Sequence, residues 1–254
     1  MTHTENPRVQ NTPPVVLITG AARRIGAATA ELFHAAGYQV IIHYNRSASD
    51  ADKLCEKFNH LRDNSCLLVQ ADLNDRQGLE KIIDLVDSLG RLDVLVNNAS
   101  SFYPTPLAGC NDQQWDDLIN SNLKGPFFLT QGLAPQLQKT HGSIVNISDM
   151  HARQTLKSHP IYSIAKAGNI AMTKSMAVEL APNVRVNSVA PGAILWPEHE
   201  QDDTDKQDSV LSKVPMGRLG CEGDIAETVF FLGVNASYMT GQTIAVDGGS
   251  SNSL

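Results

Sequence analysis

The fold is decided by the stretch VVLITGAARRIG at residues 15–26. Val15–Thr19 is apolar and has the length of a strand, and Gly20 then opens a turn. Arg24–Ala36 shows helical spacing of its apolar residues and stops at Gly37, which suits a left-handed helix end. A glycine turn between a strand and a helix lets backbone N–H groups approach a pyrophosphate at the positive end of the helix. The stretch therefore predicts the opening unit of a dinucleotide-binding fold.

The same alternation of strand and helix continues along the chain. The predicted strands are short and apolar on both faces, which is typical of a parallel sheet covered by helices. We therefore predict an α/β fold: a single doubly wound Rossmann-type domain with a seven-stranded parallel sheet and helices on both faces. The further strands are expected at Gln39–His43, Cys66–Gln70, Asp93–Val96, Ser143–Ile147, Arg185–Val189 and Gln242–Val246. The further helices are expected at Asp50–Leu61, Asp75–Leu89, Asp112–Leu137 (one long helix or two in tandem), Ile161–Leu180 and Asp224–Leu232.

Two segments depart from this alternation. Residues 1–14 are polar, carry three prolines and are expected to form a loose N-terminal tail before a domain spanning residues 15–254. Glu198–Asp208 is strongly acidic and has no apolar periodicity. It is expected to be a solvated loop or a mobile lid, within a substrate loop at residues 193–215.

Composition limits the class of protein. The chain has 254 residues, 42% of them hydrophobic and 19% charged, and a formal net charge of −7. This composition is globular, and an acidic chain without a basic stripe argues against a nucleic-acid partner. No apolar window is long enough to span a membrane. The four cysteines have no metal or redox spacing, so we expect reduced thiols in a cytoplasmic protein and no bound metal.

Two arginines bear on the cofactor. Arg24 stands where a TGxxxGxG turn would carry its middle glycine, and its guanidinium could bind phosphate and a planar heterocycle together. The second strand ends in Asn45-Arg46-Ser47, and no carboxylate follows until Asp50. An NAD-preferring fold would place an acidic residue here for the ribose hydroxyls. Arg46 and its small polar neighbours suit a 2′-phosphate instead, so we predict NADP(H).

Tyr162 and Lys166 are four residues apart and share one face of a predicted helix. Together with Asn97-Asn98-Ala99, Asn122 and the pair Pro191-Gly192, they resemble the short-chain dehydrogenase/reductase family. The resemblance runs from residue 15 to residue 249 and includes the closing segments YMTG and VDGG.

This resemblance implies a catalytic set of Asn122, Tyr162 and Lys166. A lysine ammonium near a phenol favours the phenolate, so we expect Lys166 to ease proton transfer from Tyr162 near neutral pH. In the family the lysine also binds the nicotinamide ribose, and the asparagine supports a water that links to the lysine. The implied cofactor-binding residues are Gly20, Arg24, Ile25, Asn45, Arg46, Ser47, Asp72, Leu73, Asn98, Ala99, Ser148, Lys166, Pro191, Gly192 and Ile194.

Asp149 departs from the family pattern. It lies thirteen residues before Tyr162, where the family usually has a serine that hydrogen-bonds a substrate carbonyl. A carboxylate there would repel the alkoxide formed when a carbonyl is reduced. It could accept hydrogen bonds from the N–H groups of an amino-pterin or, when protonated, donate one to a ring nitrogen. We therefore add Asp149 to the catalytic and substrate-binding residues and expect a nitrogen heterocycle as substrate.

The strings NNASSFYPTPL at residues 97–107 and HYNRSA at residues 43–48 closely resemble the pteridine reductases. That resemblance implies that Phe102 stacks the pterin against the nicotinamide, that Ser100 touches pterin and phosphate, and that Arg24 contacts both. It places apolar substrate contacts at Leu195 and Trp196. Asn45 departs from the histidine that these enzymes often have, which leaves most of the phosphate to Arg46 and Ser47.

The leading hypothesis is an NADPH-dependent pteridine reductase that acts on dihydropterins or dihydrofolate, with oxidised pterins as a further candidate substrate. One alternative is a short-chain carbonyl reductase of 3-oxoacyl or sugar substrates, with Asp149 as a local variation. A remote alternative is a non-catalytic NADP-sensing protein that kept the fold. The expected partner is a small pterin or folate, and the family resemblance implies a homotetramer.

Overall fold

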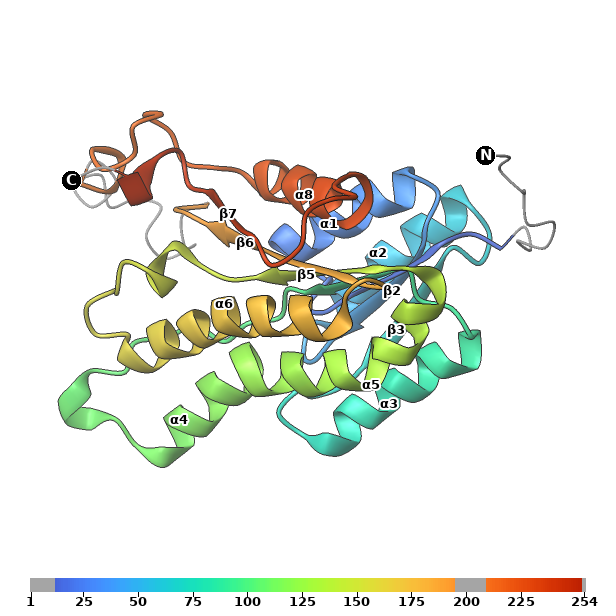
Figure 1. Cartoon of the computed structure of the whole chain (residues 1–254), viewed down its shortest axis with the longest axis horizontal. Helices are drawn as coiled ribbons and strands as arrows, with labels where there is room; N and C mark the ends of the chain where they lie inside the picture. Colours follow the sequence, from blue (N-terminus) through green and yellow to red (C-terminus); the bar gives the residue numbers. More distant parts are fainter. Residues whose placement is uncertain (1–11, 195–208, 253–254) are drawn as a thin grey trace.

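The chain folds around one parallel sheet whose seven strands lie in the order β3-β2-β1-β4-β5-β6-β7 (Figure 1). The computed structural model describes residues 12–194 and 209–252. The predicted doubly wound Rossmann-type architecture is confirmed, and each predicted strand is present within two residues of its expected bounds. The strands are β1 (Val15–Ile18), β2 (Gln39–Tyr44), β3 (Cys66–Gln70), β4 (Val94–Asn97), β5 (Ser143–Ile147), β6 (Arg185–Pro191) and β7 (Thr243–Val246).

Helices cover both faces of the sheet, as Figure 1 shows with α1, α2 and α8 above it and α3, α5 and α6 below. The helices are α1 (Arg24–Ala35), α2 (Ala48–Leu61), α3 (Arg76–Leu89), α4 (Asp112–Ile119), α5 (Gly125–Thr140), α6 (Pro160–Leu180) and α8 (Glu222–Phe230). Single 3-10 turns lie at Leu107–Gly109, Met150–Ala152 and Ser250–Asn252, and π-helical segments lie at Asn120–Lys124 and Phe231–Asn235.

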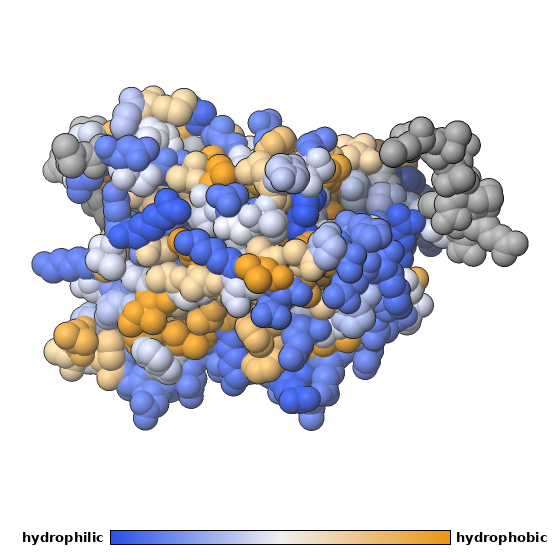
Figure 2. Space-filling model, in the orientation of Figure 1, coloured by the Kyte–Doolittle hydropathy of each residue, from blue (hydrophilic) through white to orange (hydrophobic). Residues whose placement is uncertain are grey.

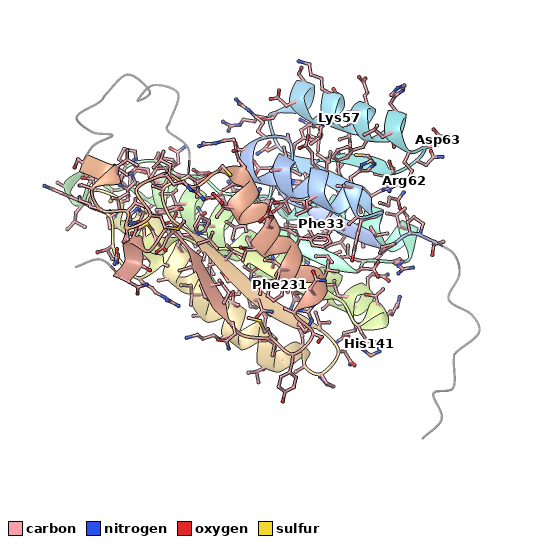
Figure 3. All side chains as sticks on the ribbon, turned by 90° about the horizontal axis from the view of Figure 1, so that it is seen from above. Phe33, Lys57, Arg62, Asp63, His141 and Phe231 are labelled. Atoms are coloured by element: carbon pink, nitrogen blue, oxygen red, sulfur yellow. The ribbon has the colours of Figure 1, made fainter. Side chains whose placement is uncertain are left out.

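The apolar strand residues alternate between two helical layers. In the layer of α1, α2 and α8, the fully buried ring of Phe33 contacts Tyr38 and Phe230, each at 5.0 Å between ring centroids. Figure 3 shows Phe33 between α1 and α8, which lie side by side. Arg62 at the end of α2 donates to the backbone oxygens of His34 and Tyr38, which closes the outer edge of this layer.

The strand order reverses between β1 and β4, and this position decides where a ligand can bind. β1 leads toward β2 and β3, whereas β4 leads toward β5, β6 and β7. In open α/β sheets ligands bind outside the carboxyl ends of the strands at such a switch point. The turn after β1 and the loop after β4 meet there, because the Asn98 N–H donates to the Thr19 hydroxyl at 2.9 Å.

The segment predicted as one long helix or two in tandem is α4 and α5, joined by the π-helical residues Asn120–Lys124. π-helical insertions frequently accompany functional sites. The tail predicted to be loose up to residue 14 is anchored from Thr12, whose oxygen accepts from Arg91 at 2.9 Å. The whole predicted acidic segment Glu198–Asp208 and the two apolar contacts Leu195 and Trp196 lie outside the described residues.

No helix in the described part of the chain is long and apolar enough to cross a membrane. All four cysteines are free thiols, as predicted. Within residues 12–194 and 209–252 no cluster of three or more His, Cys, Asp or Glu side chains could hold a metal ion.

Candidate active site

A cavity of about 1090 Å³ lies at the carboxyl edge of the sheet. It is bounded by the loops that follow the first six strands, so residues far apart in the sequence converge on it. Its size suits a cofactor together with a small substrate. It brings together nineteen of the predicted site residues, namely Gly20, Arg24, Ile25, Asn45, Arg46, Ser47, Asp72, Leu73, Asn98, Ala99, Ser100, Phe102, Ser148, Asp149, Tyr162, Lys166, Pro191, Gly192 and Ile194.

The glycine turn is held tightly from the loop after β4. The side-chain amide of Asn98 donates to the backbone oxygens of Thr19 and Gly20 at 2.8 and 3.1 Å. A Cβ at Gly26 would lie 2.3 Å from the Gly20 oxygen, so only glycine fits there. The Nδ2 group of Asn98 therefore shapes the turn, and Asn98, which the sequence predicted as a cofactor contact, also lines the cavity.

Arg24 adopts a left-handed backbone with φ of 52°. Left-handed backbone costs an ordinary L-residue about 1–2 kcal/mol, which explains why a TGxxxGxG turn has glycine at this position. Non-glycine residues held in such conformations gather at functional sites. The exposed Arg24 side chain lines the cavity, which is the placement that the sequence predicted.

The segment after β2 presents Asn45, Arg46 and Ser47 to the same cavity. In the described part of the chain, Arg46 has no ion-pair partner, whereas the neighbouring Arg23 lies 3.5 Å from Asp50. A guanidinium and a hydroxyl are thus directed at the cavity with no carboxylate of this segment lining it. This donor set suits a phosphate group.

The centre of the site is formed by Asp149, Tyr162 and Lys166. The Tyr162 hydroxyl donates to Asp149 Oδ2 at 2.7 Å, and the His151 N–H donates to Asp149 Oδ1 at 2.7 Å. Lys166 Nζ donates to the Ile147 oxygen at 2.8 Å and lies 5.7 Å from the centroid of the Tyr162 ring. Tyr162 and Lys166 are on one face of α6, as predicted, and both are buried.

The pKa of Tyr162 differs from what the sequence analysis predicted. Burial, followed by the charge and hydrogen bond of Asp149, raises the pKa of Tyr162 well above 10. The sequence predicted that Lys166 lowers this pKa, but burial and Asp149 both act in the opposite direction. Burial also lowers the pKa of Lys166 to about 8, against a smaller opposing effect of Asp149. Near neutral pH the centre therefore holds a protonated phenol, which is suited to donating a proton.

Asn122 lies behind the cavity wall rather than in it. It belongs to the π-helical segment and is only 1% exposed. Its Oδ1 accepts from the Ser100 hydroxyl at 2.6 Å, its Nδ2 donates to the Ser101 oxygen at 2.9 Å, and its backbone oxygen accepts from Asn169 at 3.3 Å. The side chain of Asn122 thus holds the loop that carries Ser100 and Phe102.

Phe102 projects into the cavity with a ring that is 55% exposed. One face of the ring stacks on His159 at a centroid distance of 4.8 Å, and the ring meets Tyr162 edge-on at 4.8 Å. His159 does not line the cavity, so it supports Phe102 from behind. The arrangement leaves an aromatic surface beside the hydroxyl of Tyr162, on which a flat ring could stack.

Two groups in this region were missed by the sequence analysis. His43 lines the cavity and holds the glycine turn, but at the end of an apolar strand it gave no signal of its own. The Tyr103 hydroxyl donates to Asp117 Oδ2 at 2.9 Å, and Asp117 Oδ1 accepts from Asn74 at 3.1 Å. These residues are scattered over the sequence, and no local pattern connects them.

Comparison with known proteins agrees with this geometry. The family profile described as enoyl-(acyl carrier protein) reductase matches residues 20–251, which is most of the chain. The chain belongs to the short-chain dehydrogenase/reductase family. It is therefore an oxidoreductase by family, and the family resemblance of the Tyr162 and Lys166 pattern is confirmed.

Its relatives include enzymes with different names. Pteridine reductase 1 of Leishmania tarentolae is 38% identical over 94% of this chain and 97% of its own length. The 3-oxoacyl-[acyl-carrier-protein] reductase FabG of Thermotoga maritima is 39% identical over 92% of this chain and 96% of its own length. The FabG of Staphylococcus aureus is 38% identical over the same shares. Overall identity does not separate the two groups, so the site itself must decide the substrate.

Proposed function

We propose that the protein is an NADPH-dependent pteridine reductase that converts dihydropterins or dihydrofolate to their tetrahydro forms. The observation that carries the proposal is the hydrogen bond of 2.7 Å between the Tyr162 hydroxyl and Asp149, beside the exposed ring of Phe102. The pteridine reductase among the relatives supports it. The loss of NADPH absorbance in the presence of a fully oxidised pterin measures whether such pterins are also reduced.

A carboxylate beside the proton donor suits a nitrogen heterocycle better than a ketone. Reduction of a ketone develops negative charge on oxygen, which Asp149 would repel across a partly desolvated site. The amino and N–H groups of a pteridine can instead donate to a carboxylate through charge-assisted hydrogen bonds. The Phe102 ring adds a stacking surface for a flat bicyclic ligand, in the geometry that aromatic pairs prefer.

The residues present fit NADPH. The glycine turn leaves no space for a Cβ at Gly26, and Arg24, Arg46 and Ser47 supply donors for phosphates. Asp72 and Leu73, which the resemblance assigns to the cofactor, line the same cavity, and Lys166 would hold the nicotinamide ribose. When bound, NADPH supplies a hydride to a ring carbon of the substrate.

In this proposal Tyr162 delivers a proton to the ring nitrogen next to that carbon. Its pKa, raised by burial and by Asp149, keeps the phenol protonated before the reaction. Asp149 orients the hydroxyl and accepts hydrogen bonds from the substrate. The Lys166 ammonium stabilises the phenolate that remains after the proton is transferred. Asn122 keeps the Ser100–Phe102 loop in place. Ser100 would touch pterin and phosphate, and Leu195 and Trp196 would contact the substrate tail.

Replacement of Arg46 tests the cofactor preference. Charge-assisted hydrogen bonds to a 2′-phosphate contribute roughly 1.5–3 kcal/mol each. Arg46→Ala is therefore expected to raise the Michaelis constant for NADPH at least tenfold and to leave that for NADH nearly unchanged. Steady-state kinetics with both cofactors measure this. Equal increases in the Michaelis constants for NADPH and NADH would contradict the assignment of Arg46 to the 2′-phosphate.

The pKa of Lys166 predicts a pH dependence. Because burial lowers this pKa to about 8, the ammonium is lost as the pH rises through that value. The kcat/KM for NADPH reports the free enzyme, so it is expected to be level below pH 8 and to fall by about tenfold per unit well above it. A pH–rate profile from pH 6 to pH 10 measures this, and a level profile throughout would show that the charge of Lys166 is not needed.

A second candidate function is reduction of a 3-oxoacyl thioester, which the FabG relatives at equal identity favour. The loss of NADPH absorbance with dihydrobiopterin, dihydrofolate or an acetoacetyl thioester separates the two. The pteridine proposal expects turnover with at least one of the first two and little with the thioester. The reverse pattern selects carbonyl reduction, and no turnover with any of them selects a non-catalytic cofactor-binding protein.

We also propose that the protein is a cytoplasmic homotetramer, as its family resemblance implies. Large hydrophobic side chains are exposed on α4, α5 and α6, and Figure 2 shows hydrophobic surface over this face. Contiguous exposed apolar surface of this kind favours association between copies. The molar mass in solution, measured by light scattering, tests the assembly. The exposed side chains are Trp115, Phe127, Phe128, Ile164 and Val178.

A further inference from the structure

His43 makes hydrogen bonds with both of its ring nitrogens beneath the cavity. Its side chain is 2% exposed, at the end of β2. The Gly20 N–H donates to Nδ1 at 3.2 Å, and Nε2 lies 3.1 Å from the Ala71 oxygen. The backbone oxygen of His43 also accepts from the Ala21 N–H at 3.0 Å. His43 therefore anchors two consecutive residues of the glycine turn.

The imidazole contacts two segments of the proposed cofactor site, and His43 belongs to the strand that leads into a third. Gly20 belongs to the turn expected to face the diphosphate. Asn45, two residues after His43, begins the segment expected to face the 2′-phosphate. Ala71 immediately precedes Asp72, which the resemblance also assigns to the cofactor. All three segments line one cavity, and the contacts of His43 fix their backbones relative to one another.

These partners determine the tautomer of the ring. An N–H can only donate, so Nδ1 must be the acceptor toward Gly20, and a carbonyl can only accept, so Nε2 must carry the proton. Burial lowers the pKa of His43 to about 4, which keeps the ring neutral near pH 7. A leucine would fill the space but would leave the Gly20 N–H and the Ala71 oxygen without these partners. Buried polar groups without partners are rare and costly.

The contacts have a consequence for the glycine turn itself. The N–H groups of Gly20 and Ala21 are both occupied within the protein, so neither is the phosphate donor that the sequence analysis expected from the turn. The hydrogen-bond donors to phosphate must therefore lie further along the chain, toward Arg24 and the start of α1. The orientation of that end of the turn depends on the peptide that His43 holds.

We propose that His43 is a positioning residue for the dinucleotide, which acts by accepting the Gly20 N–H and thereby setting the turn between β1 and α1. This inference rests on the proposed dinucleotide site. Because neither side-chain contact of His43 is made with the segment expected to face the 2′-phosphate, His43 serves NADPH and NADH alike. In this it differs from Arg46, whose effect is confined to the 2′-phosphate.

The test measures dissociation constants for NADPH and for NADH by fluorescence titration of folded variants. His43→Leu removes both side-chain contacts and is expected to weaken both cofactors by about tenfold or more, with the NADPH/NADH ratio preserved. His43→Asn can place an amide oxygen where Nδ1 lies, and we expect it to restore most of the affinity. His43→Gln keeps only the donor toward Ala71 and is expected to resemble His43→Leu.

A matched control is His34→Leu. His34 is another buried imidazole, whose Nε2 lies 2.9 Å from the Ser65 hydroxyl, and it does not line the cavity. Its replacement is expected to lower the melting temperature and to leave both dissociation constants unchanged. Unchanged affinities in His43→Leu would overturn the inference, as would a loss confined to NADPH or a failure of His43→Asn to restore binding. If the wild type bound neither cofactor, the proposed function would fail and the inference with it.

A second measurement does not depend on variants that fold. Long-range proton–nitrogen NMR of the wild type, with the His43 signals assigned, reports which ring nitrogen carries the proton. The inference expects a neutral ring protonated on Nε2, with and without NADPH. A ring protonated on Nδ1, or on both nitrogens at pH 7, would rule out acceptance of the Gly20 N–H and overturn the inference.

Discussion

Tyr162→Phe is expected to lower the turnover of dihydrobiopterin by about 100-fold or more, while NADPH still binds. The change keeps the ring, which packs edge-on against Phe102, and removes only the hydroxyl that donates to Asp149 at 2.7 Å. The pKa of that hydroxyl is raised by burial and by the carboxylate, so it is the protonated group available to the substrate. Single-turnover kinetics with prebound NADPH measure the chemical step.

The matched control is Tyr103→Phe. Tyr103 lines the same cavity, but its hydroxyl donates to Asp117 and faces the α4 side. Its loss is expected to leave turnover close to that of the wild type. If Tyr162→Phe also kept near-normal turnover, Asp149 or a water molecule would be the proton donor and Tyr162 would serve in packing alone.

Asp149→Ser is expected to reduce kcat/KM for dihydrobiopterin by about 30- to 1000-fold. The estimate corresponds to a lost hydrogen bond between the substrate and a charged group, worth on the order of 2–4 kcal/mol. The affinity for NADPH should remain nearly unchanged, because Arg24, Arg46 and Lys166 are retained. Serine restores the neutral donor that carbonyl-reducing members of the family use, so slight reduction of a small activated ketone is expected to appear.

The measurement is paired kinetics of the wild type and the variant on dihydrobiopterin and on the ketone. Asp149→Asn separates charge from shape, because its amide oxygen can still accept from the His151 N–H. We expect it to lose pterin activity as the serine variant does. Full pterin activity in Asp149→Ser would show that this carboxylate does not recognise the heterocycle by hydrogen bonding. The substrate proposal would then rest on resemblance alone.

Much of the fold could be predicted from local sequence. Apolar runs such as Cys66–Gln70 and the helical spacing of Arg76–Leu89 reflect burial on both faces of a strand and on one face of a helix. The ambiguity at Asp112–Leu137 could not be resolved in this way. A π-helical insertion changes the backbone by one residue without interrupting the apolar pattern, so α4 and α5 look continuous in the sequence.

Most of the candidate site could also be predicted, because its residues follow strands at fixed points of a known turn pattern. Arg24, Arg46, Asp149 and Tyr162 all line the cavity as expected. Asn122 was predicted as a catalytic residue, but its buried position behind Ser100 was not foreseen. A motif gives the identity of a residue and its spacing, whereas it does not give the direction of the side chain.

The sequence by itself determined the doubly wound parallel sheet, the family, and the residue types gathered at the carboxyl edge of the sheet. Only the tertiary structure decided how those groups interact. The pKa of Tyr162 rises because Asp149, thirteen residues earlier, comes within 2.7 Å of its hydroxyl in a buried setting. His43 and Gly20 likewise meet only because β1 and β2 are neighbours in the sheet. Titration and hydrogen bonding depend on distance and burial, and both are properties of the packed chain.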